Sequence, residues 1–236
     1  MKIDLQHSFD VINSLQKTEL FECLDDDACD LVSKLVKWKK YKKGAEVIPY
    51  KGEGNDVYLI GSGRVRVTIY SFTGKEISYQ DLGPGKMFGE LSAIDQLPRT
   101  ASVIALESSS VGVISRNDYW KLVAQYPGVA AAAMKRLAGL VRFLVDRVYQ
   151  YGALDVKDRV RMEVLRLARE NMSGTDIATI HDFPTHREIT NRVNTHREAV
   201  TRELNKLTRM GLIEQSQRVL TVTSVPQLQQ LLPEDI

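Results

Sequence analysis

Glu90 and Arg99 are two side chains whose chemistry and spacing could bind a phosphorylated sugar. The stretch Phe88-Gly89-Glu90-Leu91 has the pattern of the start of a short helix, whose unpaired backbone N–H groups would attract an anion. Arg99, nine residues after Glu90, could make a two-pronged, charge-assisted contact to a phosphate. A carboxylate at Glu90 would repel that phosphate, so its expected partner is a sugar hydroxyl. The alternative, a plain surface ion pair across a turn, fits less well with the glycines and the helix start around Glu90.

A second set of candidate residues lies in two copies of the tetrapeptide Thr-His-Arg-Glu, at 185–188 and 195–198. Each copy has the Thr-x-x-Glu form of a capping box, so each should open a helix. The first helix would be about two turns long, and Asn194 would adopt the left-handed backbone conformation at the bend that follows it. Two short helices around a tight turn predict a helix-turn-helix.

The helix that the second copy opens is amphipathic, because Val200, Leu204 and Leu207 recur at spacings of four and three. Arg197, Glu198 and Arg202 lie away from this apolar stripe. Residues 187–218 hold a modest surplus of basic over acidic side chains, which suits contact with phosphates but is weak evidence by itself.

Elements that could position the first pair of residues lie between 41 and 115, where short strand-like runs alternate with glycine-rich turns. The runs are Glu46-Val47-Ile48, Val57-Tyr58-Leu59-Ile60, Val65-Arg66-Val67-Thr68-Ile69-Tyr70, Glu76-Ile77-Ser78-Tyr79, Ala101-Ser102-Val103-Ile104-Ala105 and Val111-Gly112-Val113-Ile114. Several short strands at spacings of roughly eight to twelve residues predict an antiparallel, jelly-roll-like β-roll.

Helical patterns flank this region, at 8–40 before it and 116–126 after it. Pro127-Gly128 is expected to break the chain, and a long helix should follow over 129–154. Its apolar residues form a heptad seam: Met134, Leu137, Val141, Leu144, Val148 and Tyr151. One helix alone cannot bury such a seam. It packs either on its own domain or, as the favoured interpretation, against the same helix of a second subunit.

The C-terminal part predicts a winged helix-turn-helix. A further helix is expected over 158–170, and two short strands, at 211–213 and 219–222, follow the two helices that the repeated tetrapeptide opens. The class is therefore α+β, in three parts. These are a β-roll domain with N-terminal helices at 1–128, a dimerisation helix and hinge at 129–154, and a winged helix-turn-helix domain at 155–236.

Bulk composition excludes several classes of protein. The chain has 236 residues, a formal charge of +2 and the hydrophobic fraction of an ordinary globular protein. Cys23 and Cys29 match no zinc or iron–sulfur spacing, so free thiols in a reducing compartment are expected. We expect no secretory signal and no membrane span, and hence a cytoplasmic protein. The four histidines, His7, His181, His186 and His196, form no cluster, so neither a metal site, a cofactor nor an enzyme is expected.

Both segments around Glu90 and Arg99 match a known signature. Phe88-Gly89-Glu90-Leu91 with Pro98-Arg99-Thr100-Ala101 resembles the phosphate-binding cassette of cyclic-nucleotide-binding domains. Together with the helix-turn-helix, this makes the whole chain similar to the CRP/FNR superfamily of bacterial transcription regulators, and in particular to its cAMP-receptor-type members. The resemblance implies that Glu90 binds the ribose 2′-hydroxyl and that Arg99 with the Thr100 backbone binds the cyclic phosphate. It also implies that Ile77 and Tyr79 line the base pocket.

Two departures from the family pattern bear on the effector. Cyclic-AMP-activated members carry a Thr-Ser pair on the dimer helix that contacts adenine across the interface, whereas this chain has Leu144 and Val145 at the matching positions. Thr100 matches the Arg-Thr-Ala of cassettes that select cyclic GMP through the threonine hydroxyl. Cyclic AMP is therefore the first expectation and cyclic GMP a competitor. Cyclic di-GMP, another small ligand and a ligand-independent regulator are further alternatives.

The resemblance also assigns roles on the DNA side. Arg197-Glu198-Ala199-Val200-Thr201-Arg202 is similar to the start of the family's recognition helix, which implies that Arg197 and Arg202 contact guanines and Glu198 accepts from cytosine. A TGTGA-type palindrome would be the operator. Thr195 and His196 are candidates for phosphate contact, and Thr185 touches the DNA backbone at most. For Glu198 the alternative is capping alone, because a carboxylate folded back on its N-cap cannot reach a base.

Overall fold

The computed structural model describes residues 15–70, 76–172, 174 and 176–233. Its contacts divide the chain into two compact units, Met1–Arg142 and Phe143–Ile236. No helix among the described residues is long and apolar enough to cross a membrane.

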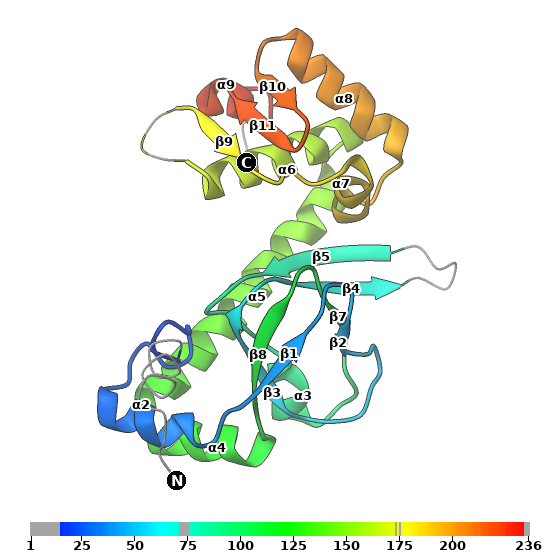
Figure 1. Ribbon diagram of the computed structural model, residues 1–236. Coiled ribbons are helices and arrows are strands. Elements are labelled where there is room, and N and C mark those ends of the chain that lie inside the picture. Colours follow the sequence, from blue (N-terminus) through cyan, green and yellow to red (C-terminus); the bar gives the residue numbers. More distant parts are fainter. Residues whose placement is uncertain (1–14, 71–75, 173, 175, 234–236) are drawn as a thin grey trace. The chain divides into compact units, whose positions relative to one another are not determined.

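The first unit is a β-roll of two four-stranded antiparallel sheets (Figure 1). One sheet has the order β1 (Lys37–Tyr41), β8 (Ser109–Ile114), β3 (Val57–Ser62) and β6 (Met87–Phe88). The other has the order β2 (Glu46–Ile48), β7 (Ser102–Ala105), β4 (Val65–Tyr70) and β5 (Glu76–Leu82). The short helix α3 (Glu90–Asp95) directly follows β6 and one glycine. The predicted β-roll is thus confirmed.

Apolar side chains from both sheets fill the interior of the roll. Ile60 and Val111 from the first sheet meet Val67 and Val103 from the second in one buried cluster. A separate cluster joins the first sheet to the helices α2 (Asp26–Ser33), α4 (Arg116–Gln125) and the start of α5 (Pro127–Ala153). This second cluster fixes the beginning of α5 against the roll, beside the element that carries Glu90.

Two expectations in this unit are wrong in part. The pattern at 8–40 predicted helix, but within the described part of that range only residues 15–16 and α2 are α-helical, and 37–41 form β1. β1 is an edge strand whose exposed lysines protect the sheet from pairing with another chain. Residues 8–14 lie outside the described part. The predicted break between two helices is present at Tyr126, which is extended, but Pro127 is already the first residue of α5, a position where a missing N–H has no cost.

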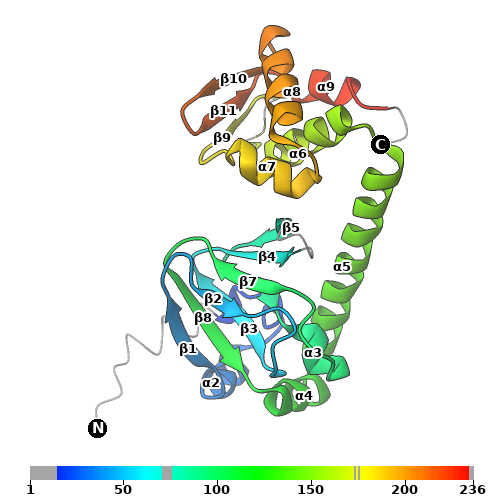
Figure 2. The same ribbon diagram turned by 90° about the vertical axis from the view of Figure 1, so that its right-hand side faces the viewer.

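The second unit contains several helices packed with a small sheet (Figure 2). Its helices are α6 (Val156–Glu170), α7 (His186–Val193), α8 (Arg197–Arg209) and α9 (Val225–Gln230). The sheet has the antiparallel order β10 (Ile213–Ser216), β11 (Val219–Val222) and β9 (Ala178–Ile180). The predicted helix-turn-helix and wing strands are present, and β9 is an addition that the sequence pattern did not indicate.

The two copies of Thr-His-Arg-Glu begin helices in different ways. In the first, Thr185 and Glu188 form the complete, reciprocal capping box, and Asn194 ends the helix with a φ of 49°. In the second, the N-cap is His196, which makes no side-chain capping hydrogen bond. The second capping box is therefore wrong. Thr195 has instead turned into the core at the bend and is buried, which leaves the Glu198 side chain exposed.

Candidate functional site

Gly89 places the Glu90 helix close to Arg99. It is the N-cap of α3 and has a φ of 83°, in the left-handed region that favours glycine. A Cβ atom at Gly89 would lie 2.8 Å from Nη1 of Arg99 and 2.9 Å from the carbonyl oxygen of Asp56. Only glycine therefore allows the backbone and the guanidinium to come together here.

The Arg99 guanidinium is held in place before any ligand binds. Its Nη1 donates to the carbonyl of Gly89 at 2.8 Å, and its Nη2 donates to the carbonyl of Asp56 at 2.9 Å. It lies over the Tyr58 ring, 5.6 Å from the centroid, and that ring stacks on Phe88. Burial lowers the pKa of Arg99 from its usual range, an effect that its charged neighbours oppose. The result is an oriented cation with little freedom to lose on binding an anion.

Glu90 is buried, with 4% of its surface exposed, and faces a basic side chain from the long helix. Its Oε1 lies 3.4 Å from Nε of Arg136 on α5, and Glu19 lies 3.7 Å from the same nitrogen. That nitrogen is buried without a hydrogen bond of good geometry. Burial raises the pKa of the Glu90 carboxyl, and the Arg136 guanidinium opposes that shift.

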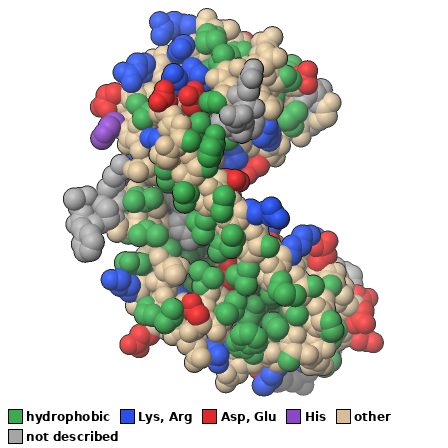
Figure 3. Space-filling model, turned by 180° about the vertical axis from the view of Figure 1, so that it is seen from behind, with side chains coloured by type: hydrophobic (Ala, Val, Ile, Leu, Met, Phe, Trp, Pro, Cys, Tyr) green, Lys and Arg blue, Asp and Glu red, His purple; other side chains and the backbone are tan. Residues whose placement is uncertain are grey.

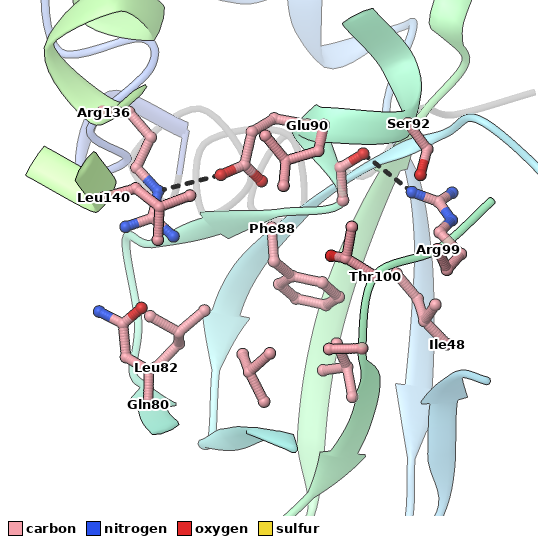
Figure 4. Close-up of a pocket in the computed structure, with 15 residues that line it drawn as sticks. Ile48, Gln80, Leu82, Phe88, Glu90, Ser92, Arg99, Thr100, Arg136 and Leu140 are labelled. Atoms are coloured by element: carbon pink, nitrogen blue, oxygen red, sulfur yellow. Dashed lines mark hydrogen bonds and ion pairs between the residues drawn. The ribbon is translucent and has the colours of Figure 1, made fainter. Parts of the chain in front are cut away.

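A pocket that is open to solvent lies between the two charged groups. Figure 4 shows Glu90 turned toward Arg136 on one side, whereas the Arg99 guanidinium lies on the other side beside Ser92. Seven of the eight residues of the predicted cassette line it, all except Pro98: Phe88, Gly89, Glu90, Leu91, Arg99, Thr100 and Ala101.

Other expected ligand residues are placed differently. Ile77 is not part of the lining, and the side chain of Tyr79 lies outside the described part of the structure. From β5 the pocket instead takes Gln80 and Leu82. Leu144 and Val145 do not line it either, and both are exposed on α5.

Sequence reasoning missed several lining residues, which are Ile48, Val67, Gln80, Leu82, Ser92, Val103, Arg136 and Leu140. The only one with a signal in the sequence is Arg136. It directly precedes the seam residue Leu137, so it lies on a flank of the long helix from which it can reach the roll.

The exposed face of α8 carries the candidate DNA-contacting residues. Arg197, Glu198 and Arg202 are all exposed. With Thr201, Asn205 and Arg209 they line one open concavity, and Lys and Arg side chains gather over this part of the second unit in Figure 3. The face is oriented by a buried ion pair on the other side of the helix, in which Arg161 of α6 donates to Glu203 at 2.6 Å.

Of the candidate residues that flank α8, one remains available for contact with DNA and two are held by contacts within the protein. His196 is exposed at the N-cap of α8, whereas Thr195 is buried and Thr185 is engaged in capping α7. His186 lies 2.9 Å from the hydroxyl of Thr201 and so contacts α8 directly. Burial lowers its pKa, and the nearby Arg197 lowers it further. Within the described ranges, no group of three His, Cys, Asp or Glu side chains is arranged to hold a metal ion.

Comparison with known proteins finds both kinds of domain. Residues 38–126 match the family described as cyclic nucleotide-binding domain, and 140–231 match the Crp-like helix-turn-helix domain. The cyclic AMP receptor protein of Thermus thermophilus is 29% identical over 200 residues, which cover 84% of this chain and 89% of that relative. A CRP-like cAMP-activated global transcriptional regulator of Mycobacterium tuberculosis is 26% identical over 201 residues, with coverage of 84% and 89%.

Solved structures show the same fold. A mutant of CooA from Carboxydothermus hydrogenoformans gives a TM-score of 0.74 at 22% identity, covering 84% of this chain and 88% of the other. The order of the elements, the pocket between Glu90 and Arg99 and the exposed face of α8 are thus found together with both domain matches. The chain belongs to the CRP/FNR family of transcription regulators, which are DNA-binding proteins and not enzymes.

Proposed function

We propose that the chain is a homodimeric transcription regulator switched by a cyclic mononucleotide, with cyclic AMP as the first candidate, and that it binds a palindromic TGTGA-type operator. The observation that carries the proposal is the pairing of a buried carboxylate with a fixed guanidinium at opposite sides of one pocket. A ribose hydroxyl needs an acceptor and a cyclic phosphate needs a cation, and these two groups supply both.

Within the pocket each part of the nucleotide has an expected partner. Glu90 would accept from the ribose 2′-hydroxyl, and Arg99 with the Thr100 backbone N–H would bind the phosphate. The base would lie toward β5, where Gln80 offers an amide and Leu82 an apolar surface. The names of the two relatives as a cyclic AMP receptor and a cAMP-activated regulator support cyclic AMP as the ligand.

Cyclic GMP is the second candidate because of Thr100. Its side chain is exposed and lines the pocket, so its hydroxyl can donate to or accept from a base. Adenine and guanine differ in their hydrogen-bonding groups. A direct comparison of the two nucleotides therefore separates the candidates.

On the DNA side we propose that Arg197 and Arg202 read guanines and Glu198 a cytosine. Glu198 is exposed, and no capping box holds it at the start of α8, so the carboxylate remains able to reach a base. Each good bidentate contact would give about 1 to 3 kcal/mol of discrimination. Two-fold symmetry would place two recognition helices about 34 Å apart, one turn of DNA. Contact with RNA polymerase and a cytoplasmic location belong to the same proposal.

Dimerisation is proposed through α5. Met134, Val141, Leu144 and Val148 of the heptad seam are all exposed, as an apolar seam would be before its partner is added. Leu144 and Val145 lack side-chain hydrogen-bonding groups. If they simply extend this apolar surface, the dimer is active without a ligand, which is the alternative within the family.

Calorimetric titration with cyclic AMP and with cyclic GMP, together with operator binding at fixed salt in the presence of each, tests the proposal. We expect one nucleotide to bind and to strengthen operator binding. Arg99→Ala should lose nucleotide binding, whereas Arg64→Ala, at an exposed position of the same roll, should keep it. No binding of either nucleotide at millimolar concentration would reject the sensor. Tight operator binding that neither nucleotide alters would support the ligand-independent alternative.

A further inference from the structure

The last carbonyl groups of α7 are held by side chains from two other helices. A helix leaves its terminal carbonyls without partners inside the helix. The carbonyl of Arg192 accepts from the hydroxyl of Tyr151 at 3.1 Å and from Nη1 of Arg147 at 3.4 Å, both on α5. The carbonyl of Val193 accepts from Nε of Arg159 on α6 at 3.1 Å. The end of α5 therefore provides polar caps for the first helix of the helix-turn-helix.

A buried carboxylate joins the same three helices. Glu163 of α6 is 3% exposed and accepts from Arg192 of α7 at 2.9 Å and from Arg166 at 2.9 and 2.7 Å. Arg147 of α5 lies 3.8 Å from it. Burial alone would raise the pKa of Glu163, but the hydrogen bonds and charges of Arg166 and Arg192 hold it below its usual range. Glu163 thus stays ionised at the centre of a cationic cluster.

Such a cluster fixes the orientation of the helices more than it stabilises the fold. Buried ion pairs add little to stability relative to apolar packing, because desolvation offsets most of their attraction. Their hydrogen bonds nevertheless require fixed angles and distances, so they fix how helices are oriented. Here they act immediately before Asn194, the left-handed residue at which the chain turns into α8.

We propose that Tyr151 and Arg147 are positioning residues for the recognition helix. Through the Arg192 carbonyl they make the end of α5, from Phe143 to Ala153, part of the DNA-binding unit, so that the direction of α8 follows the direction of this segment. The inference rests on the proposed function and extends it. Any change in how two α5 helices pair is passed to α8 through these hydrogen bonds.

Tyr151→Phe tests the proposal, because it removes one hydroxyl and keeps the ring that packs against Arg159. Tyr149→Phe is the matched control. Tyr149 is exposed on the same helix, and its hydroxyl has no hydrogen-bond partner among the described residues. The measured quantity is the affinity for operators whose half-sites lie one base pair closer together or farther apart, relative to the affinity for the unaltered operator. A merely structural role would weaken binding to every spacing equally.

We expect Tyr151→Phe to bind cyclic AMP like the parent but to lose roughly 3- to 10-fold of its preference for one half-site spacing, the effect of one net hydrogen bond. Arg147→Met should lose at least as much. Hydrogen exchange in peptides covering 190–197 should become faster in both variants and not in Tyr149→Phe. Equal exchange and equal spacing preference in Tyr151→Phe and Tyr149→Phe would overturn the proposal.

Failure of the proposed function would look different. A parent protein that binds neither nucleotide nor operator would reject that function, while the exchange measurement on the same three variants would still decide whether Tyr151 and Arg147 hold the end of α7. Unchanged exchange would then reject the positioning role by itself.

Discussion

Gly89 is the residue on which the geometry of the nucleotide pocket depends most directly. Its left-handed φ and its closeness to Arg99 are separate constraints, and the chain offers a residue that has only the first. Gly44 has a φ of 81°, and a Cβ atom there would meet nothing within 4 Å.

Gly89→Ala and Gly44→Ala should therefore differ in their effect on nucleotide binding. Gly44→Ala should lose about 1 kcal/mol of unfolding free energy, because alanine is strained at positive φ. Gly89→Ala should lose more, because its Cβ atom would also lie 2.9 Å from the carbonyl oxygen of Asp56. Only Gly89→Ala should also lose nucleotide affinity, by tenfold or more, because the new methyl group displaces the Arg99 guanidinium. Urea denaturation and calorimetry measure the two effects. Equal nucleotide affinity in both variants would show that Arg99 does not bind the ligand from its present position.

Arg136 favours the ionised form of Glu90. Since Arg136 opposes the rise in the pKa of Glu90 that burial causes, Arg136→Met should raise that pKa further. A carboxyl with a raised folded-state pKa stabilises the fold below its unfolded pKa, and this contribution is lost as pH rises through the folded pKa. Relative to the parent, Arg136→Met should thus be less stable at neutral pH, and the difference should shrink on acidification.

The same substitution should weaken nucleotide binding by about tenfold at neutral pH, as expected when a charged group loses a partner worth roughly 1.5 kcal/mol. The acid limb of the binding curve should move to higher pH, because Glu90 takes up its proton earlier. Arg142→Met, at an exposed arginine of the same helix, is the control and should match the parent in both assays. If the acid limb does not move, Arg136 has no effect on the ionisation of Glu90.

Among the elements, α7 and α8 show how the same tetrapeptide can serve two purposes. Glu188 completes the capping box of α7, whereas Glu198 stays exposed at the start of α8. Glu188→Ala should therefore reduce the unfolding free energy by about 0.5 to 2 kcal/mol, the usual value of a helix cap. Glu198→Ala should leave stability unchanged and lower operator affinity, most strongly for the sequence with the intact TGTGA half-site. The reverse result would assign the capping role to the second copy.

How far the sequence predicted the elements depended on whether the signal was local. The helix cap at Thr185 and the left-handed turn at Asn194 were predicted, because both depend on neighbours within a few residues. The capping box at Thr195 was not formed, because tertiary packing buried that side chain. β1 was mistaken for helix because its lysines gave no clear alternation. Pro127 and Gly128 were assigned to the break between α4 and α5 although they begin α5, because periodicity cannot tell a helix start from a helix end.

The pocket was predicted only in part, because several of its residues lie far apart in the sequence. Glu90 and Arg99 are close in sequence and belong to one motif, so they could be recognised together. Arg136 reaches Glu90 from a different helix, and Gln80 and Leu82 come from another strand. Their approach depends on how the roll closes and how α5 packs on it. No local pattern in the sequence specifies that packing.

At the scale of the whole molecule, each chain carries one copy of α8, so reading the proposed palindrome requires a second chain. The apolar residues along α5 supply a surface for it, and Val141 is 59% exposed there. A charge at this position would have to be buried without a partner in a helix pair, which costs several kcal/mol. In the monomer the same charge would remain in water at little cost.

Val141→Glu should therefore give a folded monomer, whereas Lys135→Glu, at an exposed position beside the seam, should remain dimeric. Sedimentation velocity distinguishes the two. Without a linked second recognition helix, operator affinity should fall by about 10² to 10⁴-fold, because binding two half-sites then loses its intramolecular advantage. Nucleotide affinity adds a further test. If it is unchanged in the monomer, Glu90, Arg99 and Arg136 of one chain suffice for the ligand. A large loss would mean that Leu144 and Val145 of the second copy complete the base pocket, and a variant that stays dimeric would exclude Val141 from the interface.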